Sequence, residues 1–179
     1  MSVVVEQDYA NARLIVVMGT CGCGKSTIGE LLALRCNAEF IEGDSLHTLK
    51  NKAKMEQGIA LTDEDRWPWL ASLGEAMRAD PTCTSRSEKI IASCSALKRS
   101  YRELITKSAN EPVLYVYLQG SKELLQSRLS GREGHFMDAN LLDSQLDTLE
   151  TPSIDEFSFT VDIDASIADL VDQIVFKIS

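Results

Sequence analysis

The stretch LIVVMGTCGCGKS, from Leu14 to Ser26, places an apolar run directly before a glycine-rich octet. The octet, residues 19–26, fits the pattern G-x-x-x-x-G-K-[ST], and a helical pattern follows it. In this order of strand, loop and helix, the motif cradles phosphate groups. Glycines let the backbone turn with positive φ and bring its N–H groups close to an anion. The helix N-terminus adds unpaired N–H groups, so the sequence predicts a nucleoside-triphosphate site.

The residue types of the loop assign roles within that site. We expect Lys25 to reach the β- and γ-phosphates of ATP, and the Ser26 hydroxyl to be a ligand of Mg²⁺. The residues expected to contact ATP are the loop residues Gly19, Thr20, Cys21, Gly22, Cys23, Gly24, Lys25, Ser26 and Thr27, together with Arg128.

Two cysteines, Cys21 and Cys23, lie inside the loop. Two thiolates one residue apart, without a nearby second pair of Cys or His, fall short of a zinc site. We interpret them as occupants of variable loop positions. A further hypothesis is that the adjacent Lys25 and helix N-terminus lower their pKa and make them easy to oxidise.

Apolar runs alternate with helical patterns along the whole chain, which is typical of a parallel sheet with crossover helices. The predicted strands are Leu14–Met18, Glu39–Glu42, 89–92, 113–118 and 157–163. A C-terminal helix carries an apolar stripe from Ile167 to Ile178. Another helix begins with a capping pattern, Thr62 followed by Asp65. The chain is therefore predicted to be an α/β protein with a central, parallel, five-stranded sheet covered by helices on both faces.

Length and charge restrict the class of protein. The 179 residues suggest one domain, or one domain with a small lid. With 18 Lys and Arg against 27 Asp and Glu, the net charge of −9 argues against general binding of nucleic acid or of an anionic membrane. We find no apolar run long enough to span a bilayer and no secretory signal. Five cysteines without a framework spacing favour a reducing, cytoplasmic location.

Further blocks follow the phosphate loop in a fixed order. They read GDSLH at residues 43–47, LTDEDRWPWL at 61–70, CSALKRSYR at 94–102 and REGHF at 132–136. In these blocks the chain resembles the gluconokinase family, small phosphate-loop kinases related to shikimate kinase. The resemblance runs from about Arg13 to the C-terminal helix. It implies a nucleoside-monophosphate-kinase-like fold, ATP-dependent phosphorylation of D-gluconate at its 6-hydroxyl, and commonly a homodimer.

The chain departs from the family pattern on the acceptor side. Thr48 and Leu49 follow His47 where relatives often have Pro and a basic residue, and Ala60 stands where Pro is usual. The third predicted strand also lacks a terminal Asp after Ile91 and Ala92, where a magnesium carboxylate is usual. We expect Asp44 to take that place.

Catalytic roles follow from the needs of phosphoryl transfer, which are in-line positioning and neutralisation of charge. Besides Lys25, we expect Asp44 to orient the attacking hydroxyl, to accept its proton, and to help hold Mg²⁺. Arg128 and Arg132 lie four residues apart, on one helical face, and are expected to close over the phosphates as part of a lid at about residues 128–140. The alternatives are a helix-capping role for Asp44 and an exposed ion-pairing face for the two arginines.

Gluconate is an anion, so cations are expected around it. The acceptor-binding segment is predicted at about residues 44–80 of a single kinase domain, residues 1–179. The expected substrate-binding residues are Asp44, His47, Arg66, Lys98, Arg102, His135 and Gln145. Surface ion pairs are the alternative for the basic members of this set, and packing is the alternative for the histidines. Asp65 is interpreted as a helix-capping acid, and Trp67 and Trp69 as core or pocket-wall aromatics.

Two other functions stay open on the sequence. The first is a phosphate-loop kinase for another small hydroxylated acid or for a nucleoside monophosphate, which Thr48, Leu49 and Ala60 keep possible. The second is a nucleotide-dependent switch without catalytic activity.

Overall fold

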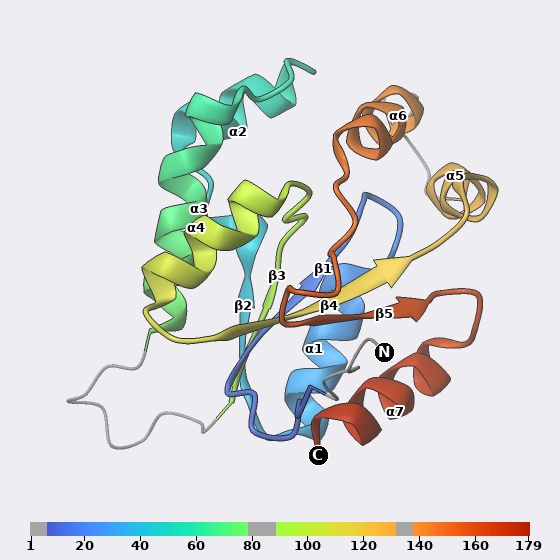
Figure 1. Ribbon diagram of the computed structural model, residues 1–179. Coiled ribbons are helices and arrows are strands. Elements are labelled where there is room, and N and C mark those ends of the chain that lie inside the picture. The colour runs from blue at the N-terminus through green and yellow to red at the C-terminus, as the bar shows by residue number, and fades with distance from the viewer. Residues whose placement is uncertain (1–6, 79–88, 132–137) are drawn as a thin grey trace.

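A computed structural model describes residues 7–78, 89–131 and 138–179 of the chain (Figure 1). In order, its elements are β1 (Leu14–Met18), α1 (Lys25–Arg35), β2 (Glu39–Glu42), the 3-10 helix η1 (Gly43–Leu46), α2 (Leu49–Glu56), α3 (Asp63–Met77), β3 (Ile90–Ser93), α4 (Arg99–Ala109), β4 (Val113–Gln119), α5 (Lys122–Ser130), α6 (Asp138–Thr148), β5 (Ser158–Asp162) and α7 (Ile167–Ile178).

The strands form one parallel sheet in the order β2-β3-β1-β4-β5. The predicted α/β class and the five parallel strands are therefore confirmed. The bounds of β1 and β2 agree with the expectation, whereas β3 begins and ends one residue later, and β4 is one residue longer. β5 is one residue shorter at each end than expected, although Ile163 still donates its N–H to Gln119 O at 2.9 Å.

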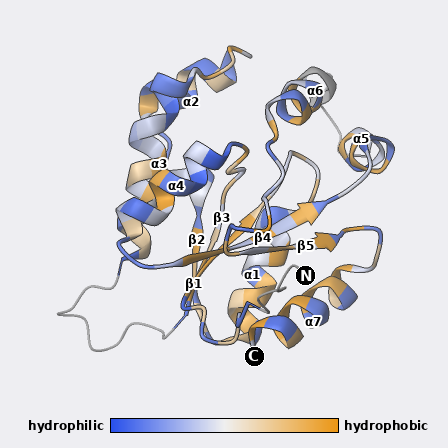
Figure 2. Ribbon diagram, viewed as in Figure 1, coloured by the Kyte–Doolittle hydropathy of each residue, from blue (hydrophilic) through white to orange (hydrophobic). Residues whose placement is uncertain are grey.

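Alternating residues of the buried strands divide the core into two layers. Ile15 and Val17 of β1 face the layer that holds α1 and α7. Leu14 and Val16 face the layer that holds α3 and α4. Figure 2 shows the strands as mainly hydrophobic and α2 as mainly hydrophilic. The helices thus cover the sheet on both faces and leave the carboxyl ends of the strands for the loops.

The capping pattern expected from Thr62 and Asp65 is present at the start of α3. Thr62 Oγ1 accepts from the N–H of Asp65, and Asp65 Oδ2 accepts from the N–H of Thr62 at 3.1 Å, which completes a capping box at the start of α3. The apolar stripe of α7 buries Leu170, Val171, Ile174 and Ile178. Within the described ranges, every helix is too short or too polar to cross a lipid bilayer.

Candidate active site

The phosphate loop joins the carboxyl end of β1 to the N-terminus of α1. Gly24 is the N-cap of α1 and has no side chain to cap it, so the first N–H groups of the helix are directed at the loop. Lys25 Nζ donates to Thr20 O at 3.0 Å, which holds the ammonium group over the loop. Gly22 has φ 81°, and a Cβ there would lie 3.1 Å from Leu125 O, so α5 packs directly against the loop.

Arg128 lies in the last turn of α5, beside this loop. Its Nη2 donates to Ile163 O at 2.8 Å, and its charge acts on Cys23 together with that of Lys25. The structure therefore brings Lys25 and Arg128 near the same loop, and the role of Arg128 toward the phosphates stays a prediction. Arg132 and His135, the other two expected residues from this part of the chain, lie outside the described residues.

The two loop cysteines differ in their surroundings. Cys23 is fully buried, and burial raises the pKa of its thiol although Lys25 acts in the opposite direction. The expectation of a lowered pKa is therefore wrong for Cys23, because desolvation of the thiolate outweighs the nearby positive charge. Cys21 is half-buried, and its N–H donates to Gln145 Oε1 at 2.7 Å.

That hydrogen bond places Gln145 differently from the expectation. Gln145 was expected to bind the acceptor, but its side chain reaches from α6 to the phosphate loop. The structure thus assigns Gln145 to the nucleotide side of the site. Residue spacing alone did not show this contact, because α6 and the loop are 124 positions apart.

Two carboxylates follow one another at the carboxyl end of β2. Glu42, the last residue of the strand, accepts a hydrogen bond from Ser93 Oγ at the end of β3. Asp44 lies in η1, where its side chain is 73% exposed. Gly43 lies between them and packs so closely that a Cβ there would be 2.0 Å from Ser93 O. Sequence reasoning did not single out Glu42 as a candidate site residue. The signal that could have found it is its position at a strand end, two residues before Asp44.

The charges of these carboxylates and of the loop lysine all act on one buried thiol, that of Cys94. Burial raises the pKa of Cys94 to about 12, and the charges of Asp44, Lys25 and Glu42 also act on this group. The end of β2 and the phosphate loop therefore lie at one edge of the sheet, where ligands bind in open α/β folds. Lys25 and Asp44 therefore lie at the same edge of the sheet.

His47 is buried behind Asp44. Its ring stacks on Trp69 with centroids 3.8 Å apart and planes inclined by 20°, and Trp69 Nε1 donates to Gly43 O at 2.7 Å. His47 Nε2 lies 4.0 Å from Asp44 Oδ1. Burial lowers the pKa of His47, more than the negative charge of Asp44 raises it, so neutral imidazole is favoured. The stack on Trp69 fits the packing alternative for His47, and its expected role in substrate binding stays a prediction.

Asp65 has the capping role read from the sequence. It pairs with Lys54 at 2.5 Å and with Lys50 at 3.6 Å, which ties α2 to the start of α3. The hydrogen bonds from Lys54 and Thr62 hold the pKa of Asp65 well below its usual range. Thr48, one of the departures from the family pattern, caps α2 by accepting from the N–H of Asn51 at 3.1 Å.

Arg66 and Lys98, two of the expected substrate-binding cations, converge on Asp63. Lys98 Nζ lies 2.8 Å from Asp63 Oδ2, and Arg66 Nη1 lies 3.5 Å from Asp63 Oδ1. Tyr101 OH donates to the same carboxylate at 2.5 Å, and the Lys98 and Tyr101 hydrogen bonds lower the pKa of Asp63. We call Asp63, Arg66, Lys98 and Tyr101 the acceptor cluster. Asp63 and Tyr101 were missed as members because only tertiary contact joins α3 to α4.

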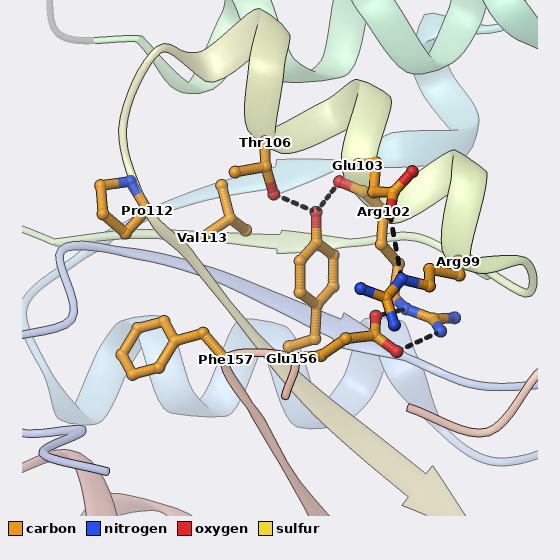
Figure 3. Close-up of a pocket in the computed structure, with 9 residues that line it drawn as sticks. Arg99, Arg102, Glu103, Thr106, Pro112, Val113, Glu156 and Phe157 are labelled. Atoms are coloured by element: carbon orange, nitrogen blue, oxygen red, sulfur yellow. Dashed lines mark hydrogen bonds and ion pairs between the residues drawn. The ribbon is translucent and has the colours of Figure 1, made fainter. Parts of the chain in front are cut away.

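Arg102 requires a correction, because the residue is only 1% exposed and its guanidinium binds other groups of the protein. Nε and Nη2 form a two-pronged ion pair with Glu156 at 2.6 and 2.9 Å, and Nη1 donates to Ala96 O at 2.9 Å. Figure 3 shows Arg102 and Glu156 pointing toward one another, beside a cavity of about 410 Å³ that Val113 and Phe157 also line. This geometry favours a structural ion pair over substrate binding, so Arg102 is removed from the substrate-binding set.

The oxygen donors at the sheet edge fit a magnesium ion. Ser26 offers a hydroxyl, and Asp44 and Glu42 offer carboxylates, whereas Mg²⁺ in such sites keeps several waters and uses one or two carboxylates together with substrate phosphates. Across residues 7–78, 89–131 and 138–179 no three His, Cys, Asp or Glu side chains gather into a cage. An all-protein cage is not the usual arrangement for this ion.

The fold and the site are those of a phosphate-loop kinase: a parallel sheet in this order, with a phosphate loop and two carboxylates at the carboxyl ends of its strands. A family model described as an AAA domain matches residues 15–145. A probable gluconokinase of Xenopus tropicalis is 41% identical over 175 residues, 90% of each chain. A gluconokinase of Gluconobacter oxydans is 46% identical over 144 residues, 80% of this chain and 79% of that one. The crystal structure of a gluconokinase from Sinorhizobium meliloti superposes with a TM-score of 0.83 at 42% identity, covering 96% of this chain and 93% of that chain. The protein belongs to the gluconokinase family.

Proposed function

We propose that the protein catalyses the ATP-dependent phosphorylation of D-gluconate to 6-phospho-D-gluconate. The observation that carries this proposal is its similarity, over most of the chain, to relatives named gluconokinases. The acceptor cluster supports it, because Arg66 and Lys98 offer two cations to an anionic acceptor.

We assign each group of residues at the sheet edge a separate role in phosphoryl transfer. The acceptor hydroxyl attacks the γ-phosphorus of ATP, the bond from that phosphorus to the β,γ-bridging oxygen breaks, and ADP leaves. Lys25, Arg128 and the N–H groups at the start of α1 bind the phosphates and stabilise the charge that develops on their oxygens. Asp44 orients the attacking hydroxyl and accepts its proton. Arg66 and Lys98 hold the carboxylate end of the acceptor, which places its far end toward the phosphate loop.

Mg²⁺ is part of the proposal, with Ser26, Asp44 and Glu42 as the residues that would hold it. When bound, the ion neutralises negative charge on the phosphates. The division of residues 1–179 into a phosphate loop at 19–26, an acceptor segment at about 44–80 and a lid at about 128–140 also belongs to the proposal.

We also propose that the protein is a cytoplasmic homodimer and that it binds neither nucleic acid nor a membrane. The thiols of Cys23, Cys36 and Cys94, which form no disulfide, support a reducing compartment. The net charge of −9 supports a small-molecule substrate rather than nucleic acid. Light scattering on the purified protein tests the homodimer directly, and a molecular mass near 20 kDa would contradict it, since one chain is 19.8 kDa.

The deciding experiment is an acceptor screen that follows ADP release with gluconate, gluconate epimers, shikimate and nucleoside monophosphates. Turnover with gluconate well above all other acceptors is expected. Turnover only with another acceptor would refute the substrate assignment, and ATP binding without stimulated turnover would favour a switch. Lys25→Ala is the matched control and is expected to abolish turnover while the fold is retained, because the phosphates lose their cation.

Asp44→Asn tests the proposed proton acceptor. It is expected to lower kcat by about a hundredfold, the usual contribution of a general base, while ATP affinity changes little. A variant with normal kcat would remove Asp44 from the mechanism.

A further inference from the structure

Asn51 lies behind His47, out of contact with solvent. It is in the first turn of α2, is 1% exposed, and its side-chain nitrogen makes two contacts. Asn51 Nδ2 donates to the backbone carbonyl oxygen of Asp65 at 2.8 Å, and it lies 3.4 Å from Nδ1 of His47. A fully buried amide with both contacts directed at fixed groups is expected to be held in one orientation.

The backbone carbonyl of Asp65 fixes the orientation of the Asn51 side-chain amide. A carbonyl oxygen only accepts hydrogen bonds, so the group of Asn51 that faces it must be the NH₂ group and not the amide oxygen. The second hydrogen of this NH₂ group is then directed at Nδ1 of His47. Nδ1 must therefore be the bare, accepting nitrogen of the imidazole.

The proton of the neutral imidazole is consequently on Nε2, the nitrogen that faces Asp44. In this tautomer Nε2 carries a hydrogen on the side of the carboxylate; its Oδ1 is 4.0 Å away, beyond a direct hydrogen bond, so the N–H acts on it through charge–dipole attraction. The opposite tautomer would direct a lone pair at the same carboxylate and repel it. The ring itself is held by its stack on Trp69, so the direction of this N–H is fixed.

We propose that Asn51 is a positioning residue, which sets the tautomer of His47 so that its Nε2–H orients the carboxylate of Asp44 toward the acceptor hydroxyl. The proposal rests on the proposed function of Asp44 in the gluconate reaction. With one carboxylate oxygen directed at His47, the other is left for the hydroxyl of the acceptor. Orienting partners of this kind contribute about ten- to a hundredfold to the activity of the groups they hold.

The tautomer can be measured without any assay of activity. The chain contains two histidines, so the ¹⁵N resonances of a protein labelled at histidine are assigned by comparison with His135→Gln. At neutral pH we expect the Nδ1 shift of His47 to be that of an unprotonated nitrogen and the Nε2 shift that of a protonated one. A proton on Nδ1 in the wild-type protein would overturn the proposal, whatever the acceptor screen shows.

Asn51→Asp tests the consequence, because an ionised carboxylate accepts from Nδ1 and so places a proton on that nitrogen. The same change removes the donor to Asp65 O, so the free energy of unfolding of the variant is measured beside its activity. We expect kcat with gluconate to fall about ten- to a hundredfold while KM for ATP stays within about twofold. Asn110→Asp, the same change at the exposed end of α4, is the matched control and should keep the wild-type kcat. A wild-type kcat in Asn51→Asp would overturn the proposal.

A double-mutant cycle separates positioning from a general loss of structure. His47→Phe keeps the stack on Trp69 but removes both ring nitrogens, so Asn51→Asp should cost little further activity in the His47→Phe background. Equal losses with and without the imidazole would show that Asn51 does not act through His47. If gluconate is not phosphorylated at all while the wild-type tautomer is as stated, the proposed function fails and the geometry of His47 stands.

Discussion

Lys98 Nζ lies 2.8 Å from Oδ2 of Asp63, which joins the N-cap of α4 to the first turn of α3. The ion pair raises the pKa of Lys98, so the lysine stays charged. Lys98 and Arg66 share one carboxylate, so the acceptor cluster carries two positive charges against one negative charge. This excess of positive charge suits an anionic acceptor.

Lys98→Met should therefore weaken gluconate binding more than ATP binding. We expect KM for gluconate to rise about tenfold or more, as for loss of a charge-assisted hydrogen bond, and KM for ATP to change less than about twofold. Lys107→Met, at an exposed position of the same helix, is the control and should leave both constants unchanged. Equal rises in both KM values would contradict a role for Lys98 in acceptor binding.

Arg102→Met tests the correction made for this residue. Its ion pair with Glu156 is buried, with side chains 2% and 11% exposed, so removal of one partner leaves an unpaired buried charge. The free energy of unfolding in urea should fall by about 3–5 kcal/mol. Replacing Glu156 by Leu in the same protein should recover much of this loss. A large rise in KM for gluconate with little loss of stability would instead restore Arg102 to the substrate-binding set.

The Asp65 capping box predicts a pH dependence of stability. The pKa of Asp65 is lowered in the folded protein, chiefly by the hydrogen bond from Lys54. A lowered pKa contributes stability that is fully present above the unfolded value of about 4 and is lost as the pH falls through the folded value. Asp65→Asn should thus destabilise the protein most at neutral pH, with the difference from wild type shrinking below about pH 4.

Urea unfolding between pH 3 and pH 7 measures this difference. Glu64→Gln changes an exposed carboxyl in the same helical turn and is the control. A constant difference between Asp65→Asn and wild type over the whole range would contradict the assignment.

Gly74 allows α3 and α4 to approach closely. A Cβ there would lie 2.4 Å from Ile105 O and 3.0 Å from Ala109 N, both of which are backbone atoms. Gly74→Ala should force the helices apart and lower the free energy of unfolding by about 1–3 kcal/mol. Gly131→Ala is the control, because φ there is −75° and the nearest atom is 3.7 Å away. Thermal unfolding of both variants checks the contrast, and equal stabilities would contradict this account of the contact.

Much of the fold was predictable because it depends on local patterns. The strand bounds agree within one residue, since continuous apolar runs between helical segments mark strands buried on both faces. The phosphate loop and the Thr62 cap were predictable for the same reason, because every atom involved lies within a few residues.

The parts that sequence reasoning missed depend on contacts between distant segments. Asp63 joins the acceptor cluster only because α4 brings Lys98 and Tyr101 to it, from 35 and 38 positions away. Arg102 was misassigned because its partner, Glu156, is 54 positions distant. Gln145 was placed on the acceptor side because nothing near it in the chain shows that α6 reaches the loop.

The order β2-β3-β1-β4-β5 also has a consequence for how the chain folds during synthesis. β1 leaves the ribosome first, yet Leu14 pairs with Ile90 on one side and with Val113 on the other. In a nascent chain that ends before β4, one edge of the central strand β1 has no partner strand, and its backbone N–H and C=O groups stay unpaired. Such late pairing slows folding and exposes the growing polypeptide to aggregation. Truncations in this region should therefore yield insoluble fragments, whereas the full-length chain closes the sheet.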